Sequence, residues 1–172
     1  VLASSIKNSQ VTIGDLFRKT KVQNNGGTND RNFTLLGDPA LKLAFPLYKI
    51  KLDSIITEDN NDSIKALSVP KISGHIENSS GTSTTNFNGW LEVVLYDKEK
   101  EIETLGDDQS IGSFNYSTRE DILFKGKTLV QNGRFSTQIF VPKDTRQNYG
   151  TARFSLYAVD SILGDASGND ES

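Results

Sequence analysis

The stretch Trp90-Leu91-Glu92-Val93-Val94-Leu95-Tyr96 is the clearest core strand in this sequence. Leu91, Val93 and Leu95 alternate onto one face, as the two-residue period of a β-strand requires. The opposite face, which begins and ends with an aromatic residue, is largely apolar too. The pattern predicts a strand in the core of a β-fold.

Shorter apolar runs with the same period flank this stretch on both sides. The further expected strands lie at residues 48–52, 64–76, 121–124, 127–130, 135–141 and 152–158, with breaks at Pro70 and Gly74. Asn132-Gly133 predicts a hairpin, because both residues tolerate the positive φ of a type I′ turn. About six to eight short strands with turn signals at roughly 8–12-residue intervals predict an antiparallel, Ig-like β-sandwich, so the fold class is mainly β.

The connections between these runs are polar. We expect a surface turn at residues 57–63, a charged turn at residues 98–101 and a loop at residues 106–117. Residues 164–172 contain almost no apolar side chain and are expected to form a mobile tail.

Residues 1–46 follow a different pattern. Apolar residues at the spacing of a helix run from Val11 to Phe17, and Ser9 or Thr12 is the expected N-cap. A polar loop at residues 23–32 follows, then a short buried strand or extended segment at residues 33–36, a Gly-Asp-Pro turn, and an alternating segment that ends at Pro46. We therefore expect two parts: a short α/β segment at residues 1–46 and a β-sandwich at residues 47–172.

Composition excludes several classes of function. The chain of 172 residues carries a net charge of −3, which gives no basic surface for nucleic acid. No apolar run approaches the roughly 20 residues that a membrane-spanning helix needs. The absence of cysteine rules out disulfides, thiolate metal sites and a cysteine nucleophile within these residues. Because the chain also lacks methionine, we expect Val1 to follow an upstream sequence in a longer protein.

The boundary region resembles a known family. Residues 32–46, which contain Leu35-Leu36-Gly37-Asp38-Pro39-Ala40-Leu41, resemble the closing segment of the gingipain-type cysteine peptidase domain, which has a caspase-like α/β fold. The preceding Val11-Thr12-Ile13-Gly14-Asp15-Leu16-Phe17, followed by Lys19 and Lys21, resembles the last helix of that domain.

Shorter pieces downstream are similar, in the same order, to the region that follows the peptidase domain in the type IX secretion sortases of this family. The pieces are Phe87-Asn88-Gly89, Val94-Leu95-Tyr96-Asp97-Lys98, Phe124-Lys125-Gly126, Asn132-Gly133-Arg134-Phe135, Val141-Pro142-Lys143-Asp144, Gly150 with Ser155-Leu156-Tyr157-Ala158, and Asp165-Ala166-Ser167-Gly168. In the family the chain continues beyond the last piece with further strands, so the resemblance implies a sandwich that is truncated at its C-terminus.

The resemblance also implies a function and a location. The sortases remove C-terminal signal domains from secreted cargo at the outer membrane and help to attach the cargo to the cell surface. This chain would be a non-catalytic C-terminal fragment of such a peptidase, exported to the outer membrane or surface of a Gram-negative bacterium, with a structural or cargo-docking role. Its implied partners are the upstream peptidase domain of the same chain, secreted cargo and outer-membrane secretion components.

No catalytic, cofactor-binding or metal-binding residue is expected. The family's catalytic histidine and cysteine lie upstream of the matching region, and neither is carried over. His75 is the single histidine. A catalytic reading would pair it with Ser73 or Ser79 and with Asp97, but serine and aspartate are so abundant that a surface-strand histidine is the better interpretation.

Acidic clusters and aromatic residues leave two alternatives open. The clusters at residues 59–62, Asp107-Asp108 and Asp165/Asp170 could offer oxygen ligands to Ca²⁺, but none has EF-hand spacing, and solvated turns are expected. Four aromatic residues on alternating runs could form a glycan-binding platform, although core positions are favoured: Trp90, Tyr96, Phe140 and Tyr157. A platform would make the chain an adhesion or carbohydrate-binding β-sandwich module of an exported bacterial surface protein.

Overall fold

The structure, a computed structural model, describes residues 11–23, 32–58, 63–107, 112–143 and 150–171. The chain divides into two compact units, Val1–Phe45 and Pro46–Ser172, and each is described by itself. Among the described residues, no helix is both long enough and apolar enough to cross a membrane.

In the described part of the first unit, residues Ile13–Gln23 form the helix α2. Thr12 is its N-cap, since the Thr12 Oγ1 accepts a hydrogen bond from the backbone N–H of Asp15 at 3.2 Å and the Thr12 hydroxyl lies 3.1 Å from Asp15 Oδ2. The expected cap at Thr12 is therefore confirmed, while Ser9 lies outside the described residues. Asp15 in the first turn and Lys21 in the last complement the helix dipole.

The segment that follows the polar loop contacts the start of α2 at a few points. The backbone N–H of Ile13 donates to the carbonyl of Leu41 at 2.8 Å, and a single β-bridge joins residues 12 and 42. Of the two alternatives expected for residues 33–36, the strand does not form, since no strand lies between residues 32 and 46. The segment is also not buried as expected, because Leu36 is 93% exposed. A strand needs a second strand along its length, and here the neighbouring element is the N-terminus of helix α2, which offers only a few backbone groups.

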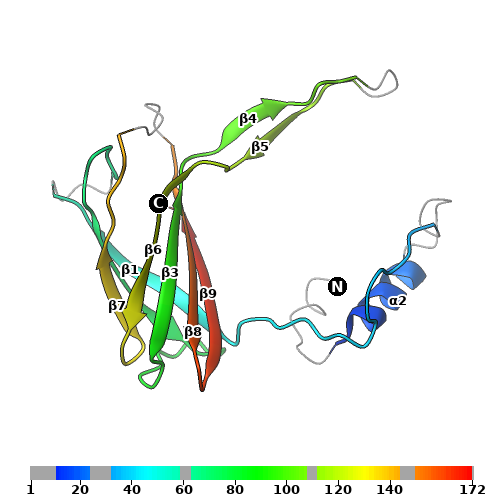
Figure 1. The fold of residues 1–172 in the computed structure, drawn as a ribbon, viewed down its shortest axis with the longest axis horizontal. Helices are drawn as coiled ribbons and strands as arrows, with labels where there is room; N and C mark the ends of the chain where they lie inside the picture. Colours follow the sequence, from blue (N-terminus) through cyan, green and yellow to red (C-terminus); the bar gives the residue numbers. More distant parts are fainter. Residues whose placement is uncertain (1–10, 24–31, 59–62, 108–111, 144–149, 172) are drawn as a thin grey trace. The chain divides into compact units, whose positions relative to one another are not determined.

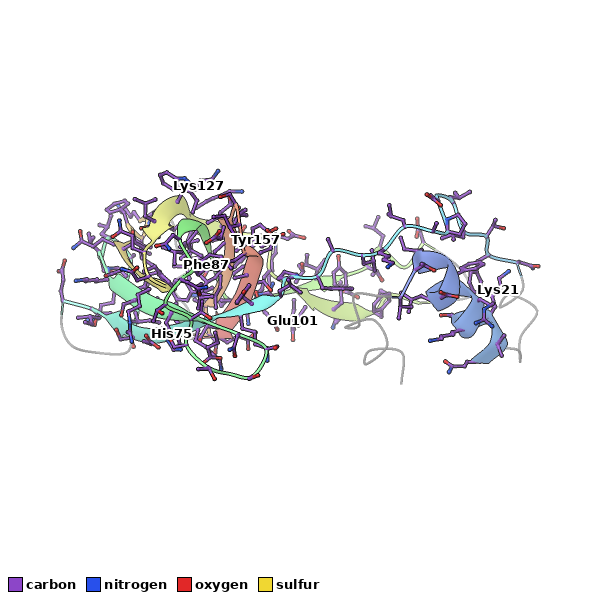
Figure 2. All side chains as sticks on the ribbon, turned by 90° about the horizontal axis from the view of Figure 1, so that it is seen from below. Lys21, His75, Phe87, Glu101, Lys127 and Tyr157 are labelled. Atoms are coloured by element: carbon purple, nitrogen blue, oxygen red, sulfur yellow. The ribbon has the colours of Figure 1, made fainter. Side chains whose placement is uncertain are left out.

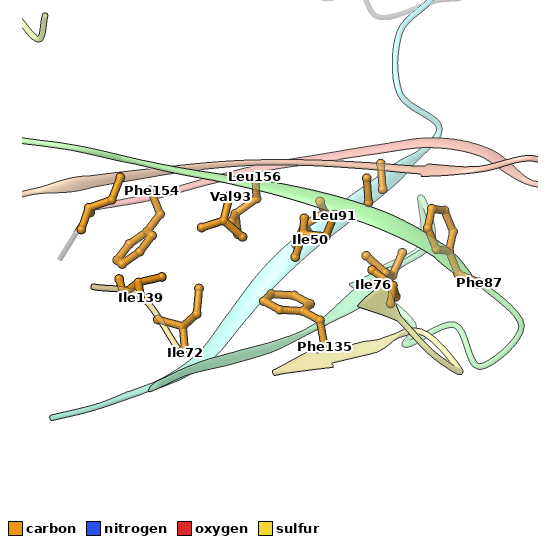
Figure 3. Packing of buried hydrophobic residues seen from close by; sticks show 14 residues of the cluster. Ile50, Ile72, Ile76, Phe87, Leu91, Val93, Phe135, Ile139, Phe154 and Leu156 are labelled. Carbon is orange, nitrogen blue, oxygen red and sulfur yellow. The ribbon is translucent and has the colours of Figure 1, made fainter. Parts of the chain in front are cut away.

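The second unit is built on a seven-stranded sheet (Figure 1). Its strands are β1 (Tyr48–Ile56), β2 (Lys71–Glu77), β3 (Gly89–Tyr96), β6 (Ile122–Val130), β7 (Arg134–Gln138), β8 (Arg153–Asp160) and β9 (Gly164–Glu171), in the order β6-β3-β8-β9-β1-β2-β7. The sheet folds over between β9 and β1, so that β6, β3, β8 and β9 form one layer and β1, β2 and β7 the other (Figures 1 and 3). The mainly β, sandwich-like fold class is confirmed.

One strand pair departs from the antiparallel expectation. Strands β1 and β9 are parallel and pair at Tyr48 with Ala166 and at Lys49 with Ser167, whereas every other described pair is antiparallel. This short parallel pair is where the two layers meet.

The core lies between the layers (Figure 3). Leu91, Val93 and Leu95 point inward from β3 with at most 1% exposure, which confirms the inward face of the stretch that predicted a core strand. The opposite layer contributes Ile72 and Phe135, among others. Removing such alternating side chains from water supplies the main stabilisation of a sandwich, at roughly 25 cal/mol per Å² of apolar surface.

The charged turn and the long loop after β3 form a second ladder instead. Strands β4 (Lys100–Glu103) and β5 (Asn115–Thr118) pair with each other and continue the β3–β6 hairpin beyond the sheet (Figure 1). The turn expected at residues 98–101 is wrong at residues 100 and 101, which belong to β4. The loop expected at residues 106–117 is wrong at residues 115–117, which belong to β5, while residues 106–107 and 112–114 lie outside the strands and residues 108–111 lie outside the described residues. Ile102 and Tyr116 lie opposite each other on one side of the hairpin, and Glu101 and Glu103 face the other side.

Three further expectations change in detail. Residues 122–130 form the single strand β6, with a bulge where it meets the end of β3, rather than two strands. Gly74 lies inside β2 and is not a break, because it leaves room for the backbone carbonyl of Lys51 and the ring of Phe135. The polar tail is strand β9, which is paired through its backbone to β8 on one side and to β1 on the other.

The hairpin between β6 and β7 has the geometry that the sequence predicts. Asn132 and Gly133 have φ angles of 51° and 71°, as a type I′ turn requires. The turn packs on the residues before β3, since the Gly133 N–H donates to the carbonyl of Phe87 at 2.8 Å and the Asn132 N–H to Asn88 Oδ1 at 2.9 Å.

Candidate functional site

An exposed apolar surface lies on the outer side of the β6–β3–β8 layer. In the strand register Trp90 lies between Leu129 on β6 and Val159 on β8. Tyr157, two residues from Val159, points to the same side. We call these four residues the outer apolar patch; they are 60%, 47%, 45% and 44% exposed in the order Trp90, Leu129, Val159, Tyr157.

The preference for core positions is wrong for three of the four aromatic residues considered. Trp90, Tyr157 and Phe140 are exposed, Phe140 at 54% on the residues that follow β7. Only Tyr96 is half-buried, with the guanidinium of Arg153 at 5.7 Å from its ring centroid. The second layer covers one side of β3; on its other side Trp90 remains on the surface, whereas Val94 is buried at 8% exposure.

A hydrogen bond and an ion pair lie beside the outer apolar patch. The Tyr157 hydroxyl donates a hydrogen bond to Asp165 Oδ2 at 2.7 Å, which fixes the phenol ring. That hydrogen bond, together with desolvation and the negative charge of Asp165, raises the pKa of Tyr157 above its ordinary value. On the other side of the patch, Lys125 Nζ lies 3.3 Å from Glu92 Oε1.

The arrangement suits recognition rather than catalysis. A Trp and a Tyr beside two aliphatic side chains make an exposed apolar surface, and charged side chains lie next to it. Such surfaces bind through stacking and apolar contact, and large ones mark binding sites in soluble proteins. The sequence signal that could have located the patch was the second apolar face of β3.

His75 does not have the neighbours that the catalytic interpretation requires. On the outer side of β2 its Nδ1 lies 2.7 Å from Asp53 Oδ1 and its Nε2 lies 3.2 Å from Glu77 Oε1. Asp53 reaches the ring from a β-bulge in β1. Carboxylates thus face both ring nitrogens, and the Ser73 hydroxyl is hydrogen-bonded to Ser54 instead. The His75 side chain is 20% exposed on the outer side of the strand.

The acidic clusters do not converge on a metal site in the described part of the chain. Asp165 and Asp170 lie on opposite faces of β9, because five residues separate them. No group of three metal-binding side chains forms among the described residues. Residues 59–62 and Asp108 lie outside the described residues.

A charged cluster fixes the base of the β4–β5 hairpin and was not predicted. The Arg119 side chain, 11% exposed, donates a hydrogen bond to the carbonyl of Thr151 at 2.7 Å. It also lies 3.5 Å from carboxylate oxygens of Glu99 and Glu171. Contacts between residues this distant in sequence have no local pattern, so no sequence signal could have found them.

In the first unit the Gly-Asp-Pro stretch is a turn, as expected. Asp38 Oδ1 accepts a hydrogen bond from the backbone N–H of Ala40 at 2.8 Å. The ring of Phe33 packs edge-on against Phe17 at 5.4 Å, with the Lys21 ammonium about 5 Å from both ring centroids. Several apolar side chains of this unit remain exposed: Phe33, Leu36, Leu41, Leu43 and Phe45.

Comparison with known proteins identifies a similar fold. No protein-family model matches the chain, and no curated protein matches it in sequence. The crystal structure of dimeric latent PorU from Porphyromonas gingivalis aligns with a TM-score of 0.61 at 22% identity, over 93% of this chain. The aligned region is 16% of the PorU chain, so this chain spans a small part of that protein. At this identity the likeness shows the fold alone.

A second solved structure is less similar. The sporulation control protein Spo0M from Bacillus subtilis aligns at 15% identity and a TM-score of 0.43, over 74% of this chain and 49% of that chain. This alignment is too weak to support an argument.

Proposed function

We propose that this chain is a non-catalytic segment of an exported protein related to PorU, a gingipain-like cysteine peptidase that acts as a type IX secretion sortase. One observation carries the proposal: PorU aligns with 93% of this chain, a share too large for one of its two units alone. The sequence pieces that resemble the sortases, from residues 11–17 to residues 165–168, support it independently.

In this proposal the first unit is the end of a peptidase domain. Its helix has no buried residue, and its apolar side chains Leu36 and Leu41 are 93% and 54% exposed. Side chains of this kind are normally buried. The rest of the peptidase domain would cover them, and the second unit would support that domain or hold secreted cargo.

The segment itself would hydrolyse nothing. It contains no cysteine, and its histidine contacts two carboxylates rather than a nucleophile. We expect the purified chain to leave denatured casein intact in the presence of dithiothreitol. Thiol-dependent cleavage by the purified chain would contradict this part of the proposal.

The role in secretion is tested in a bacterium that carries the gene. An in-frame deletion of residues 46–172 should leave secreted cargo with its C-terminal signal domain uncleaved, as measured by mass spectrometry of outer-membrane and medium fractions. Complementation with the intact gene should restore cleavage. Normal cargo maturation in the deletion strain, with the shortened protein present in the outer membrane, would overturn the proposal.

A second candidate function is favoured by the outer apolar patch. The exposed Trp90 and Tyr157 are the kind of aromatic pair on which sugar rings stack, which would make the second unit a glycan-binding or adhesion module. Trp90→Ala should abolish retention of the chain on bacterial surface polysaccharide in affinity electrophoresis. Phe140→Ala is the matched control, since Phe140 is 54% exposed, close to the 60% of Trp90, but follows β7 in the other layer. Equal retention of both variants would exclude this function for the patch.

A further inference from the structure

Strand β6 leaves one of its edges open. It stands at the end of the seven-stranded order, and in the described part of the chain its ladder is the one with β3. Strand β7 follows it through a tight turn but pairs with β2. An edge strand directs alternate N–H and C=O groups away from its sheet, and these groups can pair with another extended chain.

The side chains along this edge alternate in a defined way. Lys125, Lys127 and Leu129 lie on the outer side, in register with Val94, Glu92 and Trp90 of β3. Figure 2 shows Lys127 at the periphery of the second unit. On the inner side Gly126 has no side chain, and the ring of Phe124 lies within 2.6 Å of the place where its Cβ would be. The outer side of the edge is therefore basic, and its inner side has no side chain at Gly126.

The charge on this edge is unbalanced. Glu92 lies opposite Lys127 in the register, but its ion pair is with Lys125, whose Nζ lies 3.3 Å from Glu92 Oε1. The two lysines therefore outnumber this carboxylate. Acidic side chains on a strand added at β6 would lie directly across from the two lysines, where opposite charges attract.

The outer apolar patch points to the same edge. Its row runs from Val159 through Trp90 to Leu129, and it stops at Leu129 because β6 is the last strand of the layer. An apolar side chain opposite Leu129 on an added strand would continue the row.

We propose that the open edge of β6 is a docking site for an extended peptide that adds a strand to the sheet, with an apolar side chain opposite Leu129 and acidic side chains opposite Lys127 and Lys125. Backbone hydrogen bonds would supply the attachment, and the alternate side chains would supply the specificity. This inference goes beyond the proposed function and does not depend on it.

Two synthetic peptides test the proposal against the full chain. Thr-Val-Thr-Glu-Thr-Glu-Thr fits an antiparallel strand and Thr-Glu-Thr-Glu-Thr-Val-Thr a parallel one. With ¹⁵N-labelled protein, one of them should protect every second backbone amide of β6 from hydrogen exchange. Replacing both Glu residues of that peptide by Lys should weaken its binding roughly tenfold, the effect expected of two reversed cross-strand charge pairs.

Charge reversal on the protein provides the control. The double variant Lys125→Glu/Lys127→Glu should prefer the Lys peptide, while Lys49→Glu/Lys51→Glu, with the same change on the exposed lysines of β1, should keep the original preference. Circular dichroism verifies that both variants are folded. The proposal is overturned if millimolar peptide shifts no β6 amide, or if the β6 variant keeps the original preference, in which case the lysines only protect the edge from aggregation. Protection that rises with protein concentration in the absence of peptide would assign the edge to a second copy instead.

Discussion

The Tyr157 hydroxyl donates a 2.7 Å hydrogen bond to Asp165, its diagonal neighbour across the β8–β9 ladder. The bond joins the outer apolar patch to β9, the strand that meets the second layer. An exposed aromatic side chain would otherwise sample several rotamers, so the carboxylate of Asp165 keeps the ring in one orientation.

The pair predicts a raised tyrosine pKa. Ionisation of Tyr157 would lose the donated hydrogen bond and place a negative charge beside Asp165, so the pKa lies above its ordinary value. A group with a raised folded pKa adds stability below its unfolded pKa of about 10, and that stability is lost as the pH rises through the folded pKa. In ¹³C-tyrosine NMR, Asp165→Asn should move the titration of Tyr157 to lower pH. An unchanged midpoint in the variant would contradict the assigned cause.

The hydrogen bonds to the Asp160 carboxylate should make the stability of the second unit sensitive to acid. Its Oδ2 accepts the Asn88 N–H at 2.7 Å, and its Oδ1 accepts the N–H groups of Ile162 and Leu163 at 2.7 and 3.1 Å. These hydrogen bonds, that from Asn88 first, lower the pKa of Asp160. The resulting stability is present above the ordinary carboxyl pKa of about 4 and is lost as the pH falls through the lower folded value.

Asp160→Asn should therefore lower the midpoint of thermal unfolding at pH 7, and the difference from the original chain should shrink below pH 3. Asp107→Asn is the control, because Asp107 is exposed and its replacement should change the midpoint little at either pH. A constant difference for Asp160→Asn across this range would show that its charge state is irrelevant.

Two turn glycines, Gly81 and Gly133, allow the cost of a positive φ to be compared with the cost of a steric collision. Gly133 has a φ of 71°, and a Cβ there would collide with the backbone carbonyl of Thr84, whereas Gly81 has a φ of 79° with open space around it. Gly81→Ala should cost about 1–2 kcal/mol of unfolding free energy from the left-handed backbone alone. Gly133→Ala should cost clearly more in urea denaturation. Equal costs would show that the turn moves away from residue 84 without penalty.

Arg119 is expected to stabilise the β4–β5 hairpin locally. Its guanidinium joins the base of the hairpin to Thr151 and Glu171. Arg119→Ala should speed the exchange of the hairpin amides roughly tenfold, the effect of losing a charge-assisted hydrogen bond, and leave β3 amides unchanged. Arg18→Ala, which removes a 70%-exposed arginine in the first unit, should affect neither. Uniformly faster exchange would indicate a loss of global stability instead.

The sequence predicted the elements that leave a recognisable pattern of residue types. Residues 90–96 and the Asn132-Gly133 turn were found because alternation and positive φ leave a local pattern. Strand β9 was missed because its backbone is paired on both sides while Ala166 is its one buried side chain. Strand β4 was missed because three of its four residues are charged.

For the candidate site, the sequence left an exposed platform containing Trp90 and Tyr157 open as an alternative but favoured core positions, which are wrong for both residues. A two-residue period shows which side chains share a face, but the covering of that face depends on a distant layer. Trp90 and Leu91 are neighbours in sequence with equal apolar character, yet one is 60% exposed and the other fully buried. The second layer begins where the sheet folds over between β9 and β1. Its position determines which of the two side chains is buried.

The parallel pair between β1 and β9 also fixes an order of events for a newly made chain. Strand β1 is the first of the second unit to emerge from a ribosome or a translocation channel, and β9 is the last. Because β9 lies between β8 and β1 in the sheet, the two layers cannot join until the final strand is available. Contacts this distant in sequence form slowly. The second unit is thus expected to complete its fold only after residues 164–171 have emerged, and until then β1 and β8 remain open to other extended chains.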